Sequence, residues 1–269
     1  DTAKFSRPAL LYLENLSNKL ELIEQLKNSQ TLITVTMIKD AEEFMNKSKP
    51  KLNLSESAFW SKFTNDTSLD DCCALIGGGN GAIQTLDLLN KLGGMKPVGF
   101  FSDFSENLLD QIGIPNLGSV SIDSINAARE RFPNVKFILT VGSSPEFRIQ
   151  IAQIFGELSL DLETLIDPTA VISSNVQIGS GTLIFANVHI GTGAIIGKAC
   201  FISSNSSIEH HNIIGDGFCT GPNLNTSGGV EIGERVRFGM SVSVEPGLVI
   251  GRNCTIASGL VITKNIAEG

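Results

Sequence analysis

A hydrophobic residue recurs at every sixth position between residues 172 and 262, and this period restricts the fold more than any other feature of the sequence. Thr220 and Thr226 interrupt the apolar column, and the register continues after them without an insertion. A six-residue period fits neither an amphipathic helix nor an alternating strand of this length, but it is the signature of a β-helix. The column consists of Ile172, Ile178, Ile184, Ile190, Ile196, Ile202, Ile208, Ile214, Ile232, Phe238, Val244, Ile250, Ile256 and Ile262.

The position after each column residue is glycine in half of the sixteen repeats, which suits tight corners between short strands. A single coil cannot bury its ring of inward side chains, so neighbouring coils must stack into a continuous core. The alternative is a β-sandwich, but its strands would recur every 8 to 12 residues or so and would not hold one phase for this long. The sequence therefore predicts a β-helix over residues 168–269.

Residues 71–167 have a different pattern, in which short apolar strands alternate with helices. This alternation predicts βαβ units and a parallel sheet, as in a Rossmann-like domain. The glycine cluster from Gly77 to Gly81 follows the first strand, where backbone N–H groups and a helix dipole can bind phosphate oxygens. A tight turn without a ligand is the alternative for this cluster. The expected strands are 72–76, 96–101 and 135–141, and the expected helices are 82–92, 123–132 and 145–155.

Polar and small residues end the second and third of these strands. Ser102 and Asp103 follow the second strand, and Gly142 follows the third. Ligands of open α/β sheets bind at the carboxyl edge of the strands, where a carboxylate can accept hydrogen bonds from a base or a ribose. We therefore expect a ligand site at this edge.

Residues 1–70 are interpreted as a helical and strand extension followed by a linker, and nothing in them indicates a function. An amphipathic helix is expected from Pro8 to Lys27, a strand from Thr31 to Ile38 and a short helix ending at Lys47. The segment after Lys49 mixes turn-forming residues with three aromatic side chains and reads as a linker.

Composition restricts the partners of the chain. A net charge of -8 and a pI near 4.9 argue against nucleic acid, because phosphate contacts need clustered lysines and arginines. No apolar run is long enough to span a bilayer, so no membrane partner is expected. The five cysteines are odd in number and lack metal-ligand spacing, which predicts no metal and a reducing, cytoplasmic location.

The three histidines are the candidates for acid–base chemistry: His189, His210 and His211. If Ile208 points into the β-helix, His210 falls near a corner of the coil. Imidazole is the side chain whose unperturbed pKa lies near neutrality, so His210 could serve as a general base. A solvated corner residue without a function is the alternative, and His189 is interpreted as a surface or groove residue.

A glycine-turn domain, the LIDPTA step from Leu165 to Ala170 and a β-helix together resemble the nucleotide-sugar acyltransferases of the bacillosamine, viosamine and sialic-acid pathways. The resemblance covers roughly residues 72–264. It implies a left-handed parallel β-helix, acetyl-CoA as co-substrate, a homotrimer with active sites between subunits, and His210 as the general base of a direct transfer. The positions matching the family's substrate site are Gly79, Asn80, Gly81, Ser102, Asp103 and Gly142. Those matching its coenzyme site are Cys219, Gly239, Met240, Ser258 and Gly259.

The sequence departs from this family at three positions. Gly81 stands where many members have a histidine, and Cys219 stands where the family often has a second histidine. His211 stands where a glutamate commonly follows the catalytic histidine. What orients His210 is therefore open between Glu209 and a residue of another subunit. Cys219 as a covalent nucleophile is a rival mechanism, although no basic partner is evident for it.

The resemblance implies an N-acetyltransferase that acts on a UDP-linked amino-deoxy sugar such as UDP-4-amino-4,6-dideoxyglucose. One alternative keeps the fold but acetylates a sugar hydroxyl, as in sialic-acid O-acetylation. Another is a non-catalytic β-helix scaffold whose glycine-turn domain binds a nucleotide. The polar segment around Asn223 and Asn225 either forms a ladder or borders the active site, and the sequence does not decide between these.

Overall fold

The computed structural model describes residues 71–104 and 107–269 of the chain, and these residues belong to one structural unit, Leu54–Gly269. The helix expected at 8–27, the strand at 31–38, the short helix ending at 47 and the linker that follows all lie outside the described residues.

A three-stranded parallel sheet in the order β2-β1-β3 forms the centre of the α/β domain. All five residues of the middle strand are buried, which explains why it reads as an unbroken apolar run. The predicted parallel sheet is confirmed, and the short helix α6 is an addition to the expected elements. The elements are β1 (Cys72–Ile76), α5 (Asn80–Leu92), β2 (Lys96–Phe101), α6 (Leu108–Gln111), α7 (Ile122–Arg131), β3 (Lys136–Leu139) and α8 (Pro145–Glu157).

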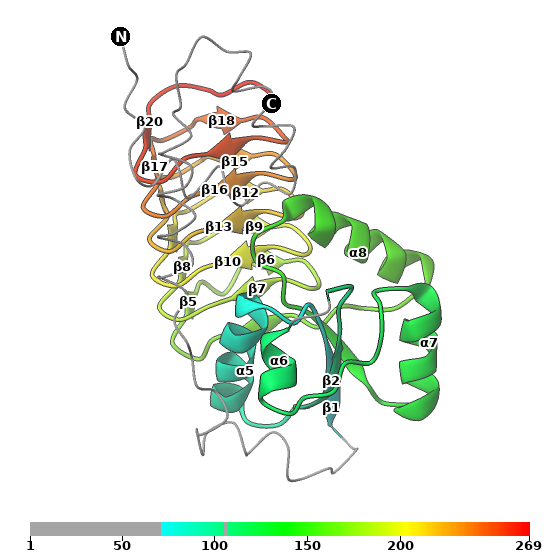
Figure 1. Ribbon diagram of the computed structural model, residues 1–269. Helices are drawn as coiled ribbons and strands as arrows, with labels where there is room; N and C mark the ends of the chain where they lie inside the picture. Colours follow the sequence, from blue (N-terminus) through cyan, green and yellow to red (C-terminus); the bar gives the residue numbers. More distant parts are fainter. Residues whose placement is uncertain (1–70, 105–106) are drawn as a thin grey trace, which may run out of the picture. The chain divides into compact units, whose positions relative to one another are not determined.

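Helices cover both faces of this sheet. Cys73 and Leu75 of β1 pack against α5 and α6, whereas Ala74 and Ile76 pack against α7 and α8. Figure 1 shows the two pairs of helices on opposite sides of β1 and β2. The alternation of side chains along β1 therefore supplies two separate cores.

The β-helix has three faces built from strands of two residues each, stacked in parallel (Figure 1). Among the described residues the faces contain six, six and five strands. The first face consists of β4 (Leu165–Ile166), β7 (Leu183–Ile184), β10 (Phe201–Ile202), β13 (Cys219–Thr220), β16 (Arg237–Phe238) and β19 (Thr255–Ile256). The second consists of β5 (Val171–Ile172), β8 (His189–Ile190), β11 (Ser207–Ile208), β14 (Asn225–Thr226), β17 (Ser243–Val244) and β20 (Val261–Ile262). The third consists of β6 (Gln177–Ile178), β9 (Ile195–Ile196), β12 (Ile213–Ile214), β15 (Glu231–Ile232) and β18 (Val249–Ile250).

Each strand directs its second residue into the prism, as the six-residue period predicts. Ile208 and Ile214, for example, are at most 1% exposed. Each coil spans three repeats, so the backbone of Ser207 pairs with that of Asn225 in the next coil. Residues 18 positions apart therefore lie one above another along the whole stack.

A buried arginine of α8 joins the α/β domain to the β-helix. The guanidinium of Arg148 is fully buried and directs its N–H groups at five backbone carbonyls. Its Cζ atom lies 5.6 Å from the ring centroid of Phe201. Burial lowers the pKa of Arg148, because removing the guanidinium from water disfavours its charged form. The acceptors are the oxygens of Leu139 (3.0 Å), Val141 (2.8 Å), Gly181 (2.9 Å), Cys200 (3.0 Å) and Ala199.

A second polar link ties α5 to the start of the β-helix. The buried carboxylate of Asp167 accepts hydrogen bonds from the backbone and hydroxyl of Thr169 at 2.9 and 2.7 Å and from the ammonium of Lys91 at 3.1 Å. Burial alone would raise the pKa of Asp167, but these hydrogen bonds and the Lys91 charge hold it below its usual value.

We predict that Arg148→Met lowers the free energy of unfolding by roughly 3–5 kcal/mol, because it leaves buried carbonyl oxygens without donors. Arg148→Lys should lose less, since an ammonium keeps the charge and offers three donors. Urea denaturation followed by circular dichroism measures both. Arg129→Met removes an exposed arginine and serves as the control, and a matching loss there would refute the assigned role of Arg148.

We also predict that Asp167→Asn destabilises the protein by roughly 1–2 kcal/mol at pH 7, where the wild-type carboxylate is ionised and bound. The folded pKa of Asp167 is depressed, so its contribution is complete above the pKa of an unfolded aspartate, near 4, and is lost as the pH falls through the folded pKa. Denaturation curves of the two proteins should therefore converge below about pH 4. A difference that stays constant down to pH 2 would contradict this assignment.

Candidate active site

His210 lies at the corner where the chain passes from the second face of the β-helix to the third. Ile208 points into the core and His210 is exposed at the turn, at the corner that the six-residue register predicts. The corner is fixed to both neighbouring coils, because the N–H of Gly229 donates to the carbonyl of His210 at 2.9 Å and the N–H of His211 donates to that of Thr192 at 2.9 Å. The backbone therefore holds the corner at a defined place in the stack.

The imidazole of His210 has contacts on two sides. Its Nδ1 lies 3.0 Å from Nδ1 of His211, in a hydrogen bond in which one of the two nitrogens carries the proton. Gly228 lies against the ring, and a Cβ built on that glycine would come within 2.2 Å of Cε1 and 2.5 Å of Nε2. Of the two ring nitrogens, Nε2 is the one not engaged by His211.

A buried asparagine braces this corner from inside the prism. The side-chain amide of Asn212 donates to the carbonyl oxygens of Glu209 at 2.6 Å and Ser227 at 3.1 Å and to the hydroxyl of Thr226 at 3.0 Å. Its Oδ1 accepts from the N–H of Val230 at 2.7 Å. Asn212 thus connects the coil of His210 to the coil of Gly228 through one fully satisfied side chain.

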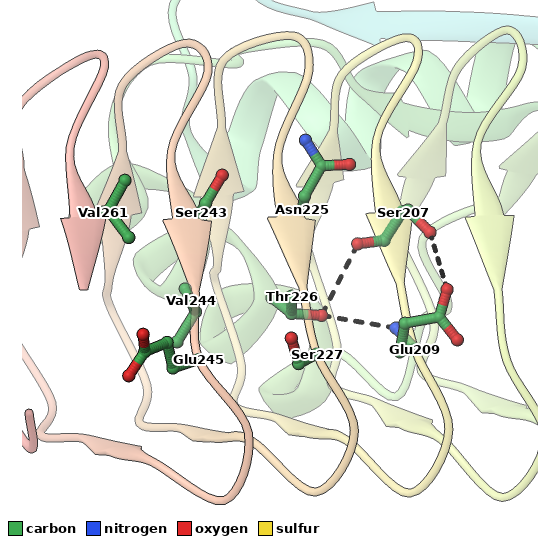
Figure 2. Close-up of a pocket in the computed structure, with 9 residues that line it drawn as sticks. All are labelled: Ser207, Glu209, Asn225, Thr226, Ser227, Ser243, Val244, Glu245 and Val261. Atoms are coloured by element: carbon green, nitrogen blue, oxygen red, sulfur yellow. Dashed lines mark hydrogen bonds between the residues drawn. The ribbon is translucent and has the colours of Figure 1, made fainter. Parts of the chain in front are cut away.

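A groove of about 340 Å³ runs across the outer face of β11, β14, β17 and β20, beside this corner (Figure 2). Glu209 and Glu245 contribute carboxylates, and no lysine or arginine lines the groove. Asn225, whose place the sequence left open, borders it, while Asn223 lies at the preceding corner and its carbonyl accepts from the amide of Asn225 at 3.2 Å. The lining residues are Ser207, Glu209, Asn225, Thr226, Ser227, Ser243, Val244, Glu245 and Val261.

Four of the five residues expected to bind the coenzyme gather at the corner between the first and second faces. The hydroxyl of Ser258 accepts from the N–H of Met240 at 3.1 Å, and the N–H of Gly259 donates to the carbonyl of Met240 at 2.8 Å. A Cβ on Gly239 would lie 2.4 Å from the Ser258 hydroxyl, whereas one on Gly259 would meet open space. Met240 is 52% exposed, so this corner has an accessible surface opposite His210 across the second face.

Cys219, the fifth of these residues, lies elsewhere. It is 1% exposed on the first face, in the cluster formed by Phe201 and the core of the α/β domain. Burial raises the pKa of its thiol to about 11, and the charges of Arg148 and Arg237 offset only part of this effect. The thiol is shielded in this structure, which disfavours the rival mechanism with a covalent cysteine intermediate.

The glycine turn of the α/β domain lies at the carboxyl edge of its sheet. The N–H of Gly77 donates to the carbonyl of Phe101, and the hydroxyl of Thr140 donates to the carbonyl of Gly77 at 2.9 Å. A Cβ on Gly81 would come within 2.0 Å of the Thr140 carbonyl, whereas Gly79 faces open space. Gly79 and Gly81 therefore lie where the three strands end, and Asn80 is the first residue of α5.

The other three predicted substrate residues are at the same edge but have local partners. Ser102 is buried and accepts from the N–H of Phe104 at 3.2 Å, and Asp103 accepts from the N–H of Val120 at 3.2 Å. Gly142 packs against the β-helix, because a Cβ there would lie 2.6 Å from the ring of Phe201. Of these three, Asp103 is the exposed side chain.

Residues 175–210 and 229–264 match the family described as bacterial transferase hexapeptide (six repeats). The C-terminal domain is a hexapeptide-repeat β-helix. Both matches fall within its stacked coils, and the interval between them, residues 211–228, contains His211, Asn212 and Gly228. The same interval contains Thr220 and Thr226, which interrupt the apolar column.

Two solved structures are similar to this chain over most of its length. PerB from Caulobacter crescentus, in complex with CoA and GDP-perosamine, has a TM-score of 0.66 and 24% identity over 73% of this chain and 91% of that one. The acetyltransferase domain of PglB from Neisseria gonorrhoeae FA1090, in complex with acetyl coenzyme A, has a TM-score of 0.66 and 22% identity over 74% of this chain and 94% of that one. These likenesses confirm the expected fold, a small α/β domain followed by a left-handed hexapeptide-repeat β-helix.

Two kinds of site are absent from residues 71–104 and 107–269. No group of three or more histidine, cysteine, aspartate or glutamate residues there could hold a metal ion. None of the helices in the same residues has the length and apolar character needed to cross a bilayer.

Sequence reasoning missed Arg148, Asn212 and Gly228. Asn212 had a visible signal, because it is a polar residue in the inward column that holds Ala194 one coil earlier and Val230 one coil later. Arg148 also had one, since it shares the apolar stripe of its helix with Ile151 and Phe155. For Gly228 no signal distinguishes it from the other corner glycines until the coils are stacked.

Proposed function

We propose that this chain is an acetyl-CoA-dependent N-acetyltransferase that acts on the amino group of a nucleotide-linked amino-deoxy sugar. The single observation that carries the proposal is the exposed imidazole of His210, whose Nδ1 is engaged by His211 and whose Nε2 can accept a proton. The complexes of the similar structures with CoA, acetyl-CoA and GDP-perosamine support the same class of reaction.

In the proposed mechanism, Nε2 of His210 accepts the proton that the sugar amine loses as its nitrogen attacks the thioester carbonyl. Backbone N–H groups stabilise the negative charge on the carbonyl oxygen while the new C–N bond forms. The C–S bond then breaks, and the imidazolium returns the proton to the departing thiolate of coenzyme A. The products are the acetylated sugar and free thiol, with no bond between enzyme and acetyl group.

Two parts of the chain suit the two substrates. The corner formed by Gly239, Met240, Ser258 and Gly259 offers exposed apolar surface and space beside Gly259, which fits the pantetheine arm of the coenzyme. The glycine turn before α5 suits the diphosphate of the sugar nucleotide, because backbone N–H groups and the positive end of the helix dipole attract phosphate. The groove beside His210 suits the diphosphate poorly, since it is lined by two carboxylates.

The nucleotide is proposed to be uridine diphosphate, on the resemblance to the bacillosamine and viosamine enzymes. A GDP-linked sugar is the second candidate, because PerB was solved with GDP-perosamine. O-acetylation of a sugar hydroxyl requires the same base, and an assay with a hydroxyl acceptor distinguishes it from N-acetylation.

We further propose a homotrimer in the cytoplasm with active sites between subunits. The third face of the β-helix supports this assembly, because Ile195 and Ile213 on the neighbouring strands β9 and β12 are 40% and 46% exposed. Val249 on β18 is 43% exposed, and the exposed Glu231 of β15 lies between it and Ile213. Exposed aliphatic side chains that gather on one face commonly mark an interface. The His210 corner leads directly into this face, so a subunit docked there would border the imidazole.

The proposed activity predicts thiol release from acetyl-CoA in the presence of UDP-4-amino-4,6-dideoxyglucose, with GDP-perosamine and N-acetylneuraminic acid assayed in parallel. His210→Ala should lower kcat by about 10²–10⁴-fold, the usual contribution of a general base, while the variant still binds CoA by calorimetry. His189→Ala, on the neighbouring strand, is the control and should keep its activity. Release with the hydroxyl acceptor alone would replace N- by O-acetylation, and full turnover by His210→Ala would reject the base.

The proposed assembly predicts a trimer mass in sedimentation equilibrium and its loss in Ile213→Glu, because a buried carboxylate without a partner opposes association. Val171→Glu places the same charge on the exposed first strand of the second face and serves as a matched control. A monomeric wild-type protein with full activity would contradict the shared active site.

A further inference from the structure

We propose that Gly228 and His211 are positioning residues that hold the His210 imidazole in one plane and one tautomer. This inference depends on the role of His210 proposed above. It adds to that role the way in which an exposed side chain, which would otherwise rotate freely, is fixed for proton transfer.

The glycine at position 228 is explained by the imidazole and not by its own backbone. Its backbone lies outside the left-handed region, whereas the next residue, Gly229, has a φ of 69° and does require a special residue. The equivalent corner positions of the coils on either side of His210 and Gly228 are Thr192 and Pro246, which carry side chains. A side chain is therefore tolerated elsewhere in this column and is missing where the ring of His210 lies.

The ring of His210 packs closely against Gly228, and this contact restricts the orientation of the ring. A Cβ at position 228 would fall 2.2 Å from Cε1, 2.5 Å from Nε2 and 2.9 Å from Nδ1 of His210. Distances this short on three ring atoms mean that the imidazole lies over the space where the Cβ would be. Adding that one atom would force the ring to move, while the flexible side chain could turn aside without disturbing the coil.

Gly228 determines where the ring of His210 lies, and His211 determines which ring nitrogen carries the proton. If Nε2 of His210 is to accept a proton, its Nδ1 must carry the hydrogen and donate it to Nδ1 of His211, which is 3.0 Å away. His211 must then hold its own proton on Nε2. The same hydrogen bond persists after His210 is protonated, since the imidazolium still donates from Nδ1.

The position of His211 has no structural need for histidine. Its φ of 58° is left-handed, and the equivalent residues of the coils below and above are Gly193 and Gly229. Neither of these coils has a carboxylate at this corner, and the carboxylate of Glu209 accepts a hydrogen bond from Ser207 at 3.2 Å on the groove side. Among the described residues, His211 is therefore the side chain placed to accept a hydrogen bond from Nδ1 of His210.

The first test is Gly228→Ala. We expect kcat to fall at least tenfold while the KM for acetyl-CoA and the thermal midpoint stay near the wild-type values, because the ring moves and the fold does not. Gly229→Asn is the matched control, since asparagine accepts a left-handed φ and nothing lies within 4 Å of its Cβ position. Wild-type kcat in Gly228→Ala would overturn the role of Gly228.

The second test compares His211→Gly with His211→Asn. Glycine matches the neighbouring coils and removes the acceptor, so kcat should fall about tenfold or more. Asparagine tolerates the left-handed backbone and offers Oδ1 where Nδ1 stood, so it should restore most of the loss. The ¹⁵N shifts of His210 should report a single tautomer protonated on Nδ1 in the wild type and a mixture in His211→Gly. Equal kcat in the two variants, or an unchanged tautomer, would overturn the role of His211.

These experiments separate the inference from the function on which it depends. Retained turnover in His210→Ala would reject His210 as the base, whatever the neighbours do. Loss of turnover in His210→Ala together with wild-type kcat in Gly228→Ala and His211→Gly would preserve the base and reject the positioning residues.

Discussion

Parallel pairing between coils is the constraint on which the rest of the structure depends. Because the backbone of each coil bonds to the next, residues 18 positions apart are fixed one above another. The corner at His210 is consequently part of a short column, in which Thr192, His210 and Gly228 succeed one another. A change in one coil acts on the side chain of its neighbour, so the position of the His210 ring depends on residues that are distant in sequence.

Arg148 attaches the α/β domain, which has its own core, to the stacked coils of the β-helix. Carbonyl oxygens at the end of β3 and in two successive coils converge at this point, and each needs a donor once water is excluded. A guanidinium supplies five N–H groups in a fixed plane, which a lysine or an amide could not. The cost of burying its charge is offset by complete hydrogen bonding, and the outcome is a defined attachment of the α/β domain to the first face.

The sequence predicted those features that follow from local periodicity. The six-residue column identified the inward residues and the corner at His210, and the strand-helix alternation identified a parallel sheet with a glycine turn at its carboxyl edge. It did not predict the environment of Cys219. The α/β domain covers this part of the first face of the β-helix, and the sequence of a two-residue strand does not show which domain packs against it. It also missed the partners of Arg148, which are backbone atoms and have no signature in the residue types.

The polar residues that replace aliphatic ones in the inward columns are informative, because burying a polar atom costs free energy unless it is hydrogen-bonded. Inside the prism an aliphatic residue needs no partner, whereas Asn212 and Thr226 must satisfy every polar atom, and they do so by bonding to each other and to the two coils that form the corner. Aliphatic residues fill these inward positions in the coils above, as at Val230 and Val244. A stack selected only for stability would keep them here too. Polar residues at 212 and 226, together with the glycine at 228 and the left-handed histidine at 211, therefore support the proposal that this corner fixes the position of one imidazole.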